Sequence, residues 1–154
     1  MKKIGIVDTT FSRYDMVKEA IDELYSTGSG FEIIQKTVPG IKDLPVECKI
    51  LFDTDHCDIV MAFGMPGPMP IDKQCAHESS IGLIITQLLT NKHIIEVFVY
   101  EDEADSDEAL KNICVNRARK HARNVYYMLF NPSYLMEYRG MGLRQGGIDK
   151  GSVE

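Results

Sequence analysis

The sequence contains no apolar run long enough to cross a membrane and no run of basic residues. Met1-Lys2-Lys3 is followed only by Ile4-Gly5-Ile6-Val7 before Asp8, and this stretch is too short for a signal peptide or a membrane span. The formal net charge of -6 argues against a nucleic-acid-binding surface. These absences predict a protein that binds neither membranes nor nucleic acid.

Cysteine is scarce and scattered. Cys48, Cys57, Cys75 and Cys114 form no Cys-x-x-Cys pair, so we expect neither a disulfide nor a zinc site. Free thiols are typical of a reducing compartment, which predicts a cytoplasmic protein. A length of 154 residues and a mass of 17.4 kDa fit one domain.

Three common α/β motifs are also missing. The turn after the first apolar run reads Asp8-Thr9-Thr10-Phe11-Ser12-Arg13, which lacks the glycines that let a backbone approach a dinucleotide pyrophosphate. The chain has no Gly-Lys-Ser or Gly-Lys-Thr phosphate loop and no Gly-x-Ser-x-Gly nucleophile elbow. These absences disfavour a nicotinamide enzyme, a P-loop nucleotidase and a serine hydrolase.

Apolar periodicity alternates between strand and helix four times. Strands are predicted at Lys3 to Asp8, Phe31 to Val38, Cys57 to Phe63 and Ile94 to Tyr100. Helices are predicted from an N-cap at Ser12 to Tyr25, from Asp43 to about Asp55, from about Ala76 to Asn91 with Ser79 and Ser80 in its first turn, and from a capping pair at Asp105 and Glu108 to a break at Asn131-Pro132. This alternation predicts a four-stranded parallel sheet in a three-layer α/β/α fold.

Residues 1–130 are predicted to form this single α/β domain, and residues 131–154 a C-terminal extension. The glycine-rich tail from Ser133 is expected to be an extended or mobile arm. The helix from Ala76 to Asn91 is unusually apolar, with Ile81, Ile84, Ile85, Leu88 and Leu89. Such a helix can bury a face against another chain, which predicts a homo-oligomer.

Four loops follow the carboxyl ends of the four predicted strands, where open α/β sheets bind ligands. They are Thr9-Thr10-Phe11, Val38 to Asp43, Gly64 to Glu78 and Tyr100 to Glu103. Together they provide an aromatic ring, backbone donors beside glycines, hydroxyls, carboxylates and an imidazole. This set suits a flat heterocycle that carries a sugar-like chain.

The same loops carry a family resemblance. Val38-Pro-Gly-Ile-Lys-Asp-Leu-Pro45 and Thr10-Phe11 resemble elements of lumazine synthases. The archaeal-type riboflavin synthase is resembled more closely, in the segments Val7-Asp-Thr-Thr-Phe-Ser-Arg13, Gly64-Met-Pro-Gly67, Cys75-Ala-His-Glu-Ser-Ser80 and Thr90 to Ala104. This match extends over roughly residues 3 to 147 and includes Gly142-Leu-Arg-Gln-Gly146 in the tail. The resemblance implies a lumazine synthase-like (flavodoxin-like) fold.

The resemblance also implies an activity and an assembly. The activity is dismutation of two molecules of 6,7-dimethyl-8-ribityllumazine to riboflavin and 5-amino-6-ribitylaminouracil by transfer of a four-carbon unit. The assembly is a homopentamer with active sites between subunits. No resident cofactor or metal is implied, and the sequence leaves open whether a divalent metal assists.

Roles for individual residues are expected on this basis. His77 would move a proton, with Glu78 orienting it or acting as a second acid-base group. Phe11 would stack on the ring, and Asp43 would contact the polyol. The remaining expected contacts are Thr10, Val38, Pro39, Gly40, Gly64, Met65, Glu101 from an adjoining subunit, and Arg117, which follows Asn116 much as a lysine follows an asparagine in lumazine synthases.

Plainer interpretations stand beside these. His77 alone would more often be a surface residue, Phe11 a core residue, and Glu101-Asp102-Glu103 a solvated turn.

The alternative enzyme is lumazine synthase, which uses a four-carbon phosphate. Its loop usually carries Gly-x-Thr, whereas this chain has Met69 to Gln74, where Pro70 lacks an N–H and Asp72 repels an anion. Lys73 keeps the phosphate question open. A non-catalytic flavin or lumazine carrier is the third possibility.

Overall fold

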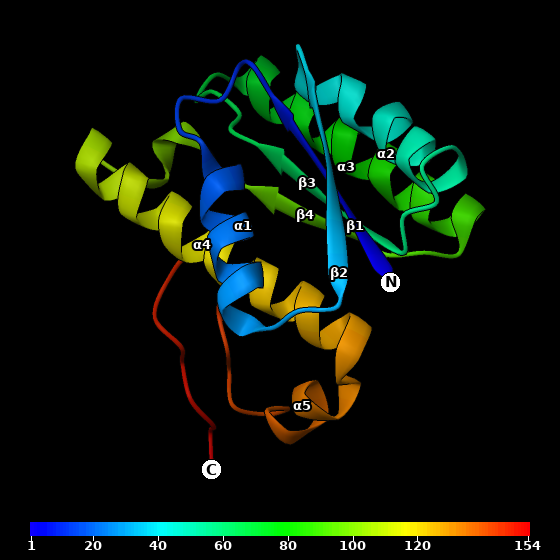
Figure 1. Cartoon of the computed structure of the whole chain (residues 1–154). Coiled ribbons are helices and arrows are strands. Elements are labelled where there is room, and N and C mark those ends of the chain that lie inside the picture. The colour runs from blue at the N-terminus through cyan, green and yellow to red at the C-terminus, as the bar shows by residue number, and fades with distance from the viewer.

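The computed structural model describes residues 1–154 as one α/β unit (Figure 1). The strands are β1 (Lys2–Thr9), β2 (Phe31–Val38), β3 (Ile59–Gly64) and β4 (Ile94–Phe98). The helices are α1 (Met16–Thr27), α2 (Leu44–Asp53), α3 (Pro70–Thr90), α4 (Asp107–Phe130) and α5 (Pro132–Glu137), with short 3-10 helices at Ile41–Asp43 and Glu101–Glu103. None of these helices combines the length and apolar character needed to span a membrane.

All four strands are parallel and lie in the order β2-β1-β3-β4. This is the flavodoxin-like order, and the predicted three-layer fold is confirmed. The chain leaves β1 toward β2 on one side and later returns to pair β3 on the other side. The carboxyl ends of β1 and β3 therefore form a switch point, where the two following loops diverge and leave a crevice.

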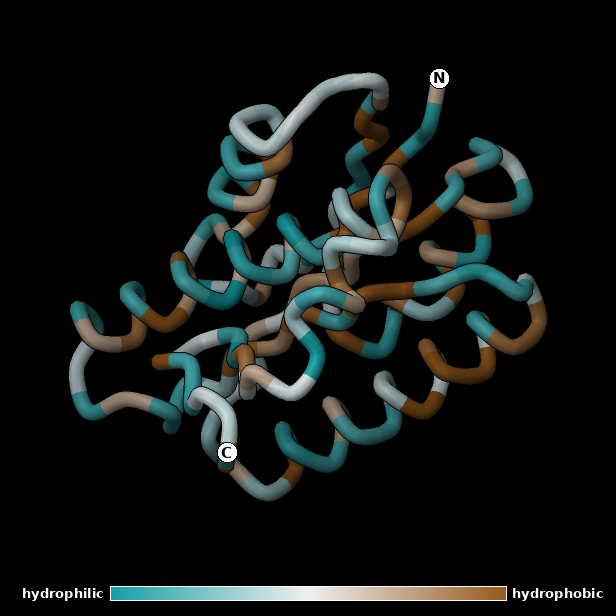
Figure 2. Tube along the Cα trace, turned by 90° about the horizontal axis from the view of Figure 1, so that it is seen from below, coloured by the Kyte–Doolittle hydropathy of each residue, from teal (hydrophilic) through white to brown (hydrophobic).

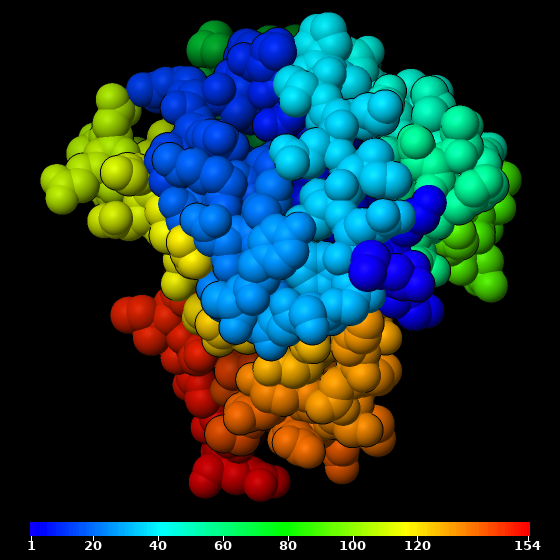
Figure 3. All heavy atoms as spheres, in the orientation of Figure 1, coloured from blue at the N-terminus to red at the C-terminus, as the bar shows by residue number.

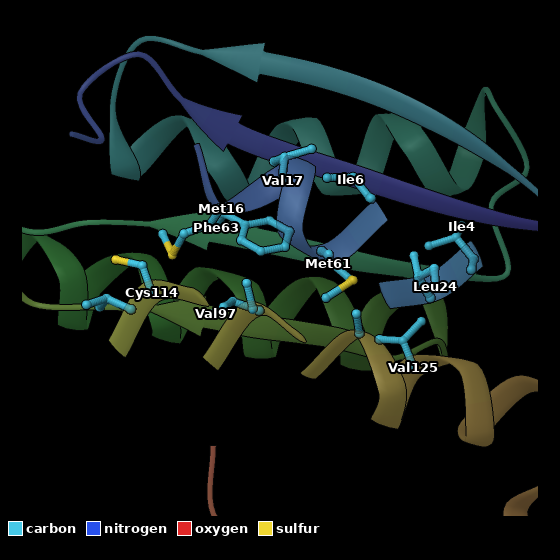
Figure 4. Close-up of a cluster of buried hydrophobic side chains, with 14 of the residues drawn as sticks. Ile4, Ile6, Met16, Val17, Leu24, Met61, Phe63, Val97, Cys114 and Val125 are labelled. Carbon is cyan, nitrogen blue, oxygen red and sulfur yellow. The ribbon is translucent and has the colours of Figure 1, made fainter. Parts of the chain in front are cut away.

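Helices cover both faces of the sheet. Side chains alternate between the two faces along β1, where Ile4 and Ile6 pack toward α1 and α4 while Val7 packs toward α2 and α3. Figure 4 shows Ile4, Ile6, Met61 and Phe63 meeting helix residues in the first of these two cores. Figure 2 shows apolar and polar residues alternating along the helices, as expected where one helix side faces a core.

Three helix starts differ from the sequence predictions. Asp15, not Ser12, caps α1, because its Oδ1 accepts the N–H of Lys18 at 3.2 Å, whereas the Ser12 hydroxyl lies 3.1 Å from the Thr9 hydroxyl. Ser106, not the Asp105–Glu108 pair, caps α4 by accepting the N–H of Ala109 at 3.1 Å. The predicted caps were wrong because several short polar side chains compete at each start, and backbone geometry selects one.

The third difference concerns α3, which starts at Pro70 and not near Ala76. Proline is compatible with the first helical position because its missing N–H would have no partner there. Ser79 is therefore well inside the helix, where its hydroxyl donates to the carbonyl of Ile41 at 2.7 Å. Ser80 hydrogen-bonds to Glu96 on β4.

The tail is only partly the extended arm that its glycines predict. Residues after the Asn131-Pro132 break form α5, where Tyr134 stacks on Tyr127 of α4 with ring centroids 3.6 Å apart. Gly146 N–H then donates to Asn116 of α4 at 2.8 Å, and Lys120 pairs with Asp149 at 2.9 Å. Figure 3 shows the last residues beside α5 at one end of the molecule.

Candidate active site

A pocket of about 180 Å³ lies at the switch point of the sheet. Its walls come from the loops after β1, β2 and β3 and from the first turns of α3. The lining residues are Thr9, Phe11, Gly40, Ile41, Met65, Pro66, Gly67, Asp72 and Cys75. Three of the four predicted loops therefore meet at one hollow.

The loop after β1 provides an aromatic ring at the edge of the pocket. Phe11 is 58% exposed, although a phenylalanine of a folded domain is usually buried. The backbone beneath it is fixed, because Thr10 N–H donates to the carbonyl of Val38 at 3.0 Å and its hydroxyl donates to that of Pro39 at 3.3 Å. The ring is thus exposed on a well-anchored turn, which suits stacking on a planar ligand.

The loop after β2 is closed by its own carboxylate. Asp43 Oδ2 accepts the N–H of Gly40 at 3.0 Å, so both groups already have a partner within the loop. The tip of β3 packs tightly against this loop, since a Cβ on Gly64 would lie 3.0 Å from Ile41 and from Phe98. Met65 is buried in the floor of the pocket.

His77 and Glu78 do not line this pocket. Both are exposed on α3, beyond the turn that carries Asp72 and Cys75. Glu78 bridges Lys42, at 3.1 Å, and Gln74, at 3.2 Å. The hydrogen bond from Lys42 is the main reason why the pKa of Glu78 is lowered from its ordinary value. Glu78 is therefore a stable carboxylate, able to orient a neighbour but a weak base.

The acidic turn after β4 is held by three cations from three different elements. Glu101 lies 3.8 Å from Arg13, Asp102 lies 2.5 Å from Lys73, and Glu103 is bound by Arg117. The Glu101 N–H also donates to the carbonyl of Pro66 at 3.0 Å, which ties the turn to a wall of the pocket. The turn is thus fixed in place rather than freely solvated.

Arg117 lies apart from the pocket and joins three segments. Its guanidinium donates to both carboxylate oxygens of Glu103 at 2.7 and 2.8 Å, to the carbonyl of Phe98 at 3.0 Å and to that of Gln145 at 3.1 Å. Burial acts to raise the pKa of Glu103, but the hydrogen bonds from Arg117 and the Tyr100 N–H outweigh burial and lower it. Within one chain Arg117 positions the acidic turn.

The cysteines divide into three buried thiols and one at the pocket. All four are free. Burial raises the pKa of Cys57 and of Cys114 to about 11 and raises that of Cys48 further, so these three thiols stay protonated. Cys75 lines the pocket. No three His, Cys, Asp or Glu side chains in residues 1–154 are grouped to hold a metal ion.

Of the expected contacts, only Phe11, Gly40 and Met65 line the pocket. Thr10, Val38, Pro39, Asp43, Gly64 and Glu101 lie in or beside the loops that build it, and their ligand roles stay predictions. Sequence alone does not single out Ile41, Pro66, Gly67, Asp72 or Cys75 as pocket residues. The sequence marks them in other ways: Ile41, Pro66, Gly67 and Cys75 lie in segments that carry the family resemblance, and Asp72 is expected to repel an anion.

Known proteins resemble the chain over almost its whole length. A family model described as 6,7-dimethyl-8-ribityllumazine synthase matches residues 1–132. A riboflavin synthase of Methanothermobacter thermautotrophicus is 59% identical over 99% of this chain and 100% of its own length. Riboflavin synthases of Archaeoglobus fulgidus and Aeropyrum pernix are 46% and 42% identical, over 98% and 99% of this chain and equal shares of their own. The chain belongs to the 6,7-dimethyl-8-ribityllumazine synthase family, on the branch whose curated archaeal relatives are riboflavin synthases.

Proposed function

We propose that this protein catalyses the dismutation of two molecules of 6,7-dimethyl-8-ribityllumazine to riboflavin and 5-amino-6-ribitylaminouracil. The observation that carries the proposal is an exposed, anchored Phe11 at the edge of a pocket built from three strand-end loops. The relatives named riboflavin synthase match through the tail as well as the domain, which supports the same assignment.

The size of the pocket supports an active site shared between subunits. Sites for drug-sized ligands usually enclose about 300 Å³ or more. One chain provides about 180 Å³, which is below this range. A second chain would supply the missing walls.

The outer face of α3 supports the same assembly. Ile81, Ile84, Ile85, Leu88 and Leu89 are between 45% and 78% exposed along one helix. A continuous apolar stripe of this kind normally marks a protein interface. We propose a closed ring of identical subunits, a homopentamer, with these stripes buried. Four free thiols are compatible with a reducing compartment, so the proposal includes a cytoplasmic location.

The reaction needs only a modest general base from the protein. The 7-methyl group of the lumazine is acidic because its carbanion delocalises into the ring, so positioning supplies much of the catalysis. His77 would move the proton and the Glu78 carboxylate would orient it, across an interface from the partner's pocket. Their exposure on α3 beside the apolar stripe is compatible with that role.

Incubation of the purified protein with the lumazine alone tests the proposal. Riboflavin synthesis turns the substrate into a yellow-green fluorescent flavin and releases one aminouracil per flavin. A lumazine synthase would need the aminouracil and a four-carbon phosphate, and a carrier would return the lumazine unchanged. Failure to form flavin from lumazine alone would reject the assignment.

The role of His77 needs a separate experiment. His77→Ala should slow single-turnover flavin formation at least about a hundredfold, the lower end of what general acid-base groups contribute. His93→Ala, which removes an exposed imidazole just before β4, is the matched control and should leave the rate unchanged. An unchanged rate in His77→Ala would remove this residue from the mechanism.

A further inference from the structure

The carboxylate of Asp72 lies at the N-terminal end of α3, beside the pocket. Asp72 Oδ2 accepts the N–H of Met69 at 3.1 Å. The same oxygen lies beside Gly67, where a Cβ would come within 2.5 Å of it. Gly67 therefore leaves the space that Asp72 fills, and both residues line the pocket.

The start of a long helix is ordinarily a place for an external anion, because its first N–H groups are unpaired and its dipole is positive there. At α3 most of these donors are absent or already used. The N–H of Met69 goes to Asp72, Pro70 has none, and the N–H groups of Asp72 and Lys73 donate to the carbonyl of Met69 at 3.0 and 3.2 Å. A phosphate placed here would meet a negative charge and almost no free donor.

The neighbouring cations are also matched by carboxylates. Lys73, the one base in the first turns of α3, has its ammonium 2.5 Å from Asp102 of the acidic turn. Lys42 pairs with Glu78 at 3.1 Å and Arg13 with Asp107 at 2.9 Å. Each of these three cations already has a carboxylate partner in the same chain, which reduces the positive charge that the chain offers to a phosphate dianion.

We propose that Asp72, with the Lys73–Asp102 pair, sets the selectivity of the pocket by filling its anion position and so excluding phosphate esters in favour of uncharged ring substrates. This inference rests on the proposed function for the identity of the substrate. Asp72 acts on binding and takes no part in bond making. Its charge lowers the affinity of any dianion at this point, while a neutral lumazine is unaffected.

Calorimetric titration with inorganic phosphate, at constant ionic strength maintained with chloride, tests the proposal. The variant Asp72→Ala/Asp102→Asn opens the position and frees Lys73, and it should bind phosphate at least about tenfold more tightly than the parent protein. Phosphate should also inhibit lumazine conversion competitively in this variant alone. The matched control Asp15→Ala/Asp53→Asn removes the α1 cap and the partner of Lys49, an equal change of charge away from the pocket, and should gain nothing.

Equal gains in both double variants would show a general charge effect and overturn the proposal, as would no gain in the pocket variant. Should the alanine variant fail to fold, Asp72→Asn/Asp102→Asn keeps the cap oxygen and still removes both charges, and it should show a smaller gain of the same sign. Phosphate binding is measured from the heat of binding, and this measurement does not require catalytic turnover. Absence of flavin formation by the parent protein would therefore reject the proposed function without deciding the selectivity of the pocket.

Discussion

The ion pair between Arg117 and Glu103 should contribute more to stability than any surface pair of this protein. Two charge-assisted hydrogen bonds join the side chains at 2.7 and 2.8 Å, and the side chains are only 16% and 29% exposed. Such bonds contribute roughly 1.5 kcal/mol or more each, and partial exposure reduces the sum, so we expect a coupling free energy of about 2 kcal/mol. Arg117→Ala also loses the bonds to Phe98 and Gln145 and should cost about 4 kcal/mol.

A double-mutant cycle with Arg117→Ala and Glu103→Gln measures this coupling from urea unfolding. All variants must be compared at one protein concentration, because association adds to apparent stability. The exposed pair Lys49–Asp53, with side chains 44% and 53% exposed, is the control and should couple by less than about 0.5 kcal/mol. A coupling as small as this at Arg117–Glu103 would refute the role of Arg117 as the anchor of the acidic turn.

The Arg117–Glu103 pair also determines in which direction the unfolding free energy changes with pH. The pKa of Glu103 is lowered in the folded protein, so the unfolded chain binds more protons at acidic pH. Its contribution is fully present above the unfolded value near 4.5 and is lost as the pH falls through the lower folded value. The cycle repeated at pH 7 and at the lowest pH where the protein stays folded should show the coupling decrease.

Three further predictions concern a half-buried histidine of α4, the C-terminal end of α1 and the pocket. Burial, and secondarily the charge of Arg117, lowers the pKa of His121 from 6.5 to about 4. The unfolding free energy should therefore fall by up to about 3 kcal/mol as the pH decreases from 6.5 to 4. His121→Gln should make the unfolding free energy less dependent on pH in this range. Gly28→Ala should destabilise by about 1–3 kcal/mol in thermal or urea unfolding, because its Cβ would lie 2.1 Å from the Tyr126 hydroxyl, whereas Gly147→Ala has no neighbour within 4 Å and should be neutral. Phe11→Ala should change the unfolding free energy by under about 1 kcal/mol but reduce lumazine conversion at least about tenfold. The control Tyr25→Ala, which removes a ring 59% exposed on α1, should leave conversion intact. Equal losses of conversion in both variants would remove Phe11 from the site.

The layers of the fold are predictable because they depend on apolar periodicity. Ile4, Ile6 and Val7 alternate between two cores, and the amphipathic helices between strands require a parallel sheet. The helix starts are less predictable because each depends on which of several polar side chains reaches a free N–H. Asp15 prevails over Ser12, and Pro70 opens a helix inside a stretch whose prolines and glycine suggest only loop.

The site is predictable to the level of loops and not of side chains. Strand order brings the loops after β1, β2 and β3 together, so Phe11, Gly40 and Met65 line one pocket, and their contacts with a ligand stay predictions. Which carboxylates face the ligand depends on pairing across the fold. Asp43 bonds to Gly40 within its own loop, and Arg117 is held by Glu103. Such partners lie far apart in sequence or within a loop whose shape no periodicity reveals.

Helix α3 connects the pocket to the proposed assembly because one rigid element carries three different surfaces. Its first turns place Asp72 and Cys75 at the pocket, its inner side packs Ala76 and Leu83 into the core, and its outer side exposes Ile84 and its apolar neighbours. A helix fixed by the core on one side and by a second chain on the other has little freedom to move at its start. Association would therefore do two things at once: it would complete the walls around Phe11, and it would hold the Asp72 carboxylate where it excludes phosphate. Selectivity and assembly would then depend on the same 21-residue helix.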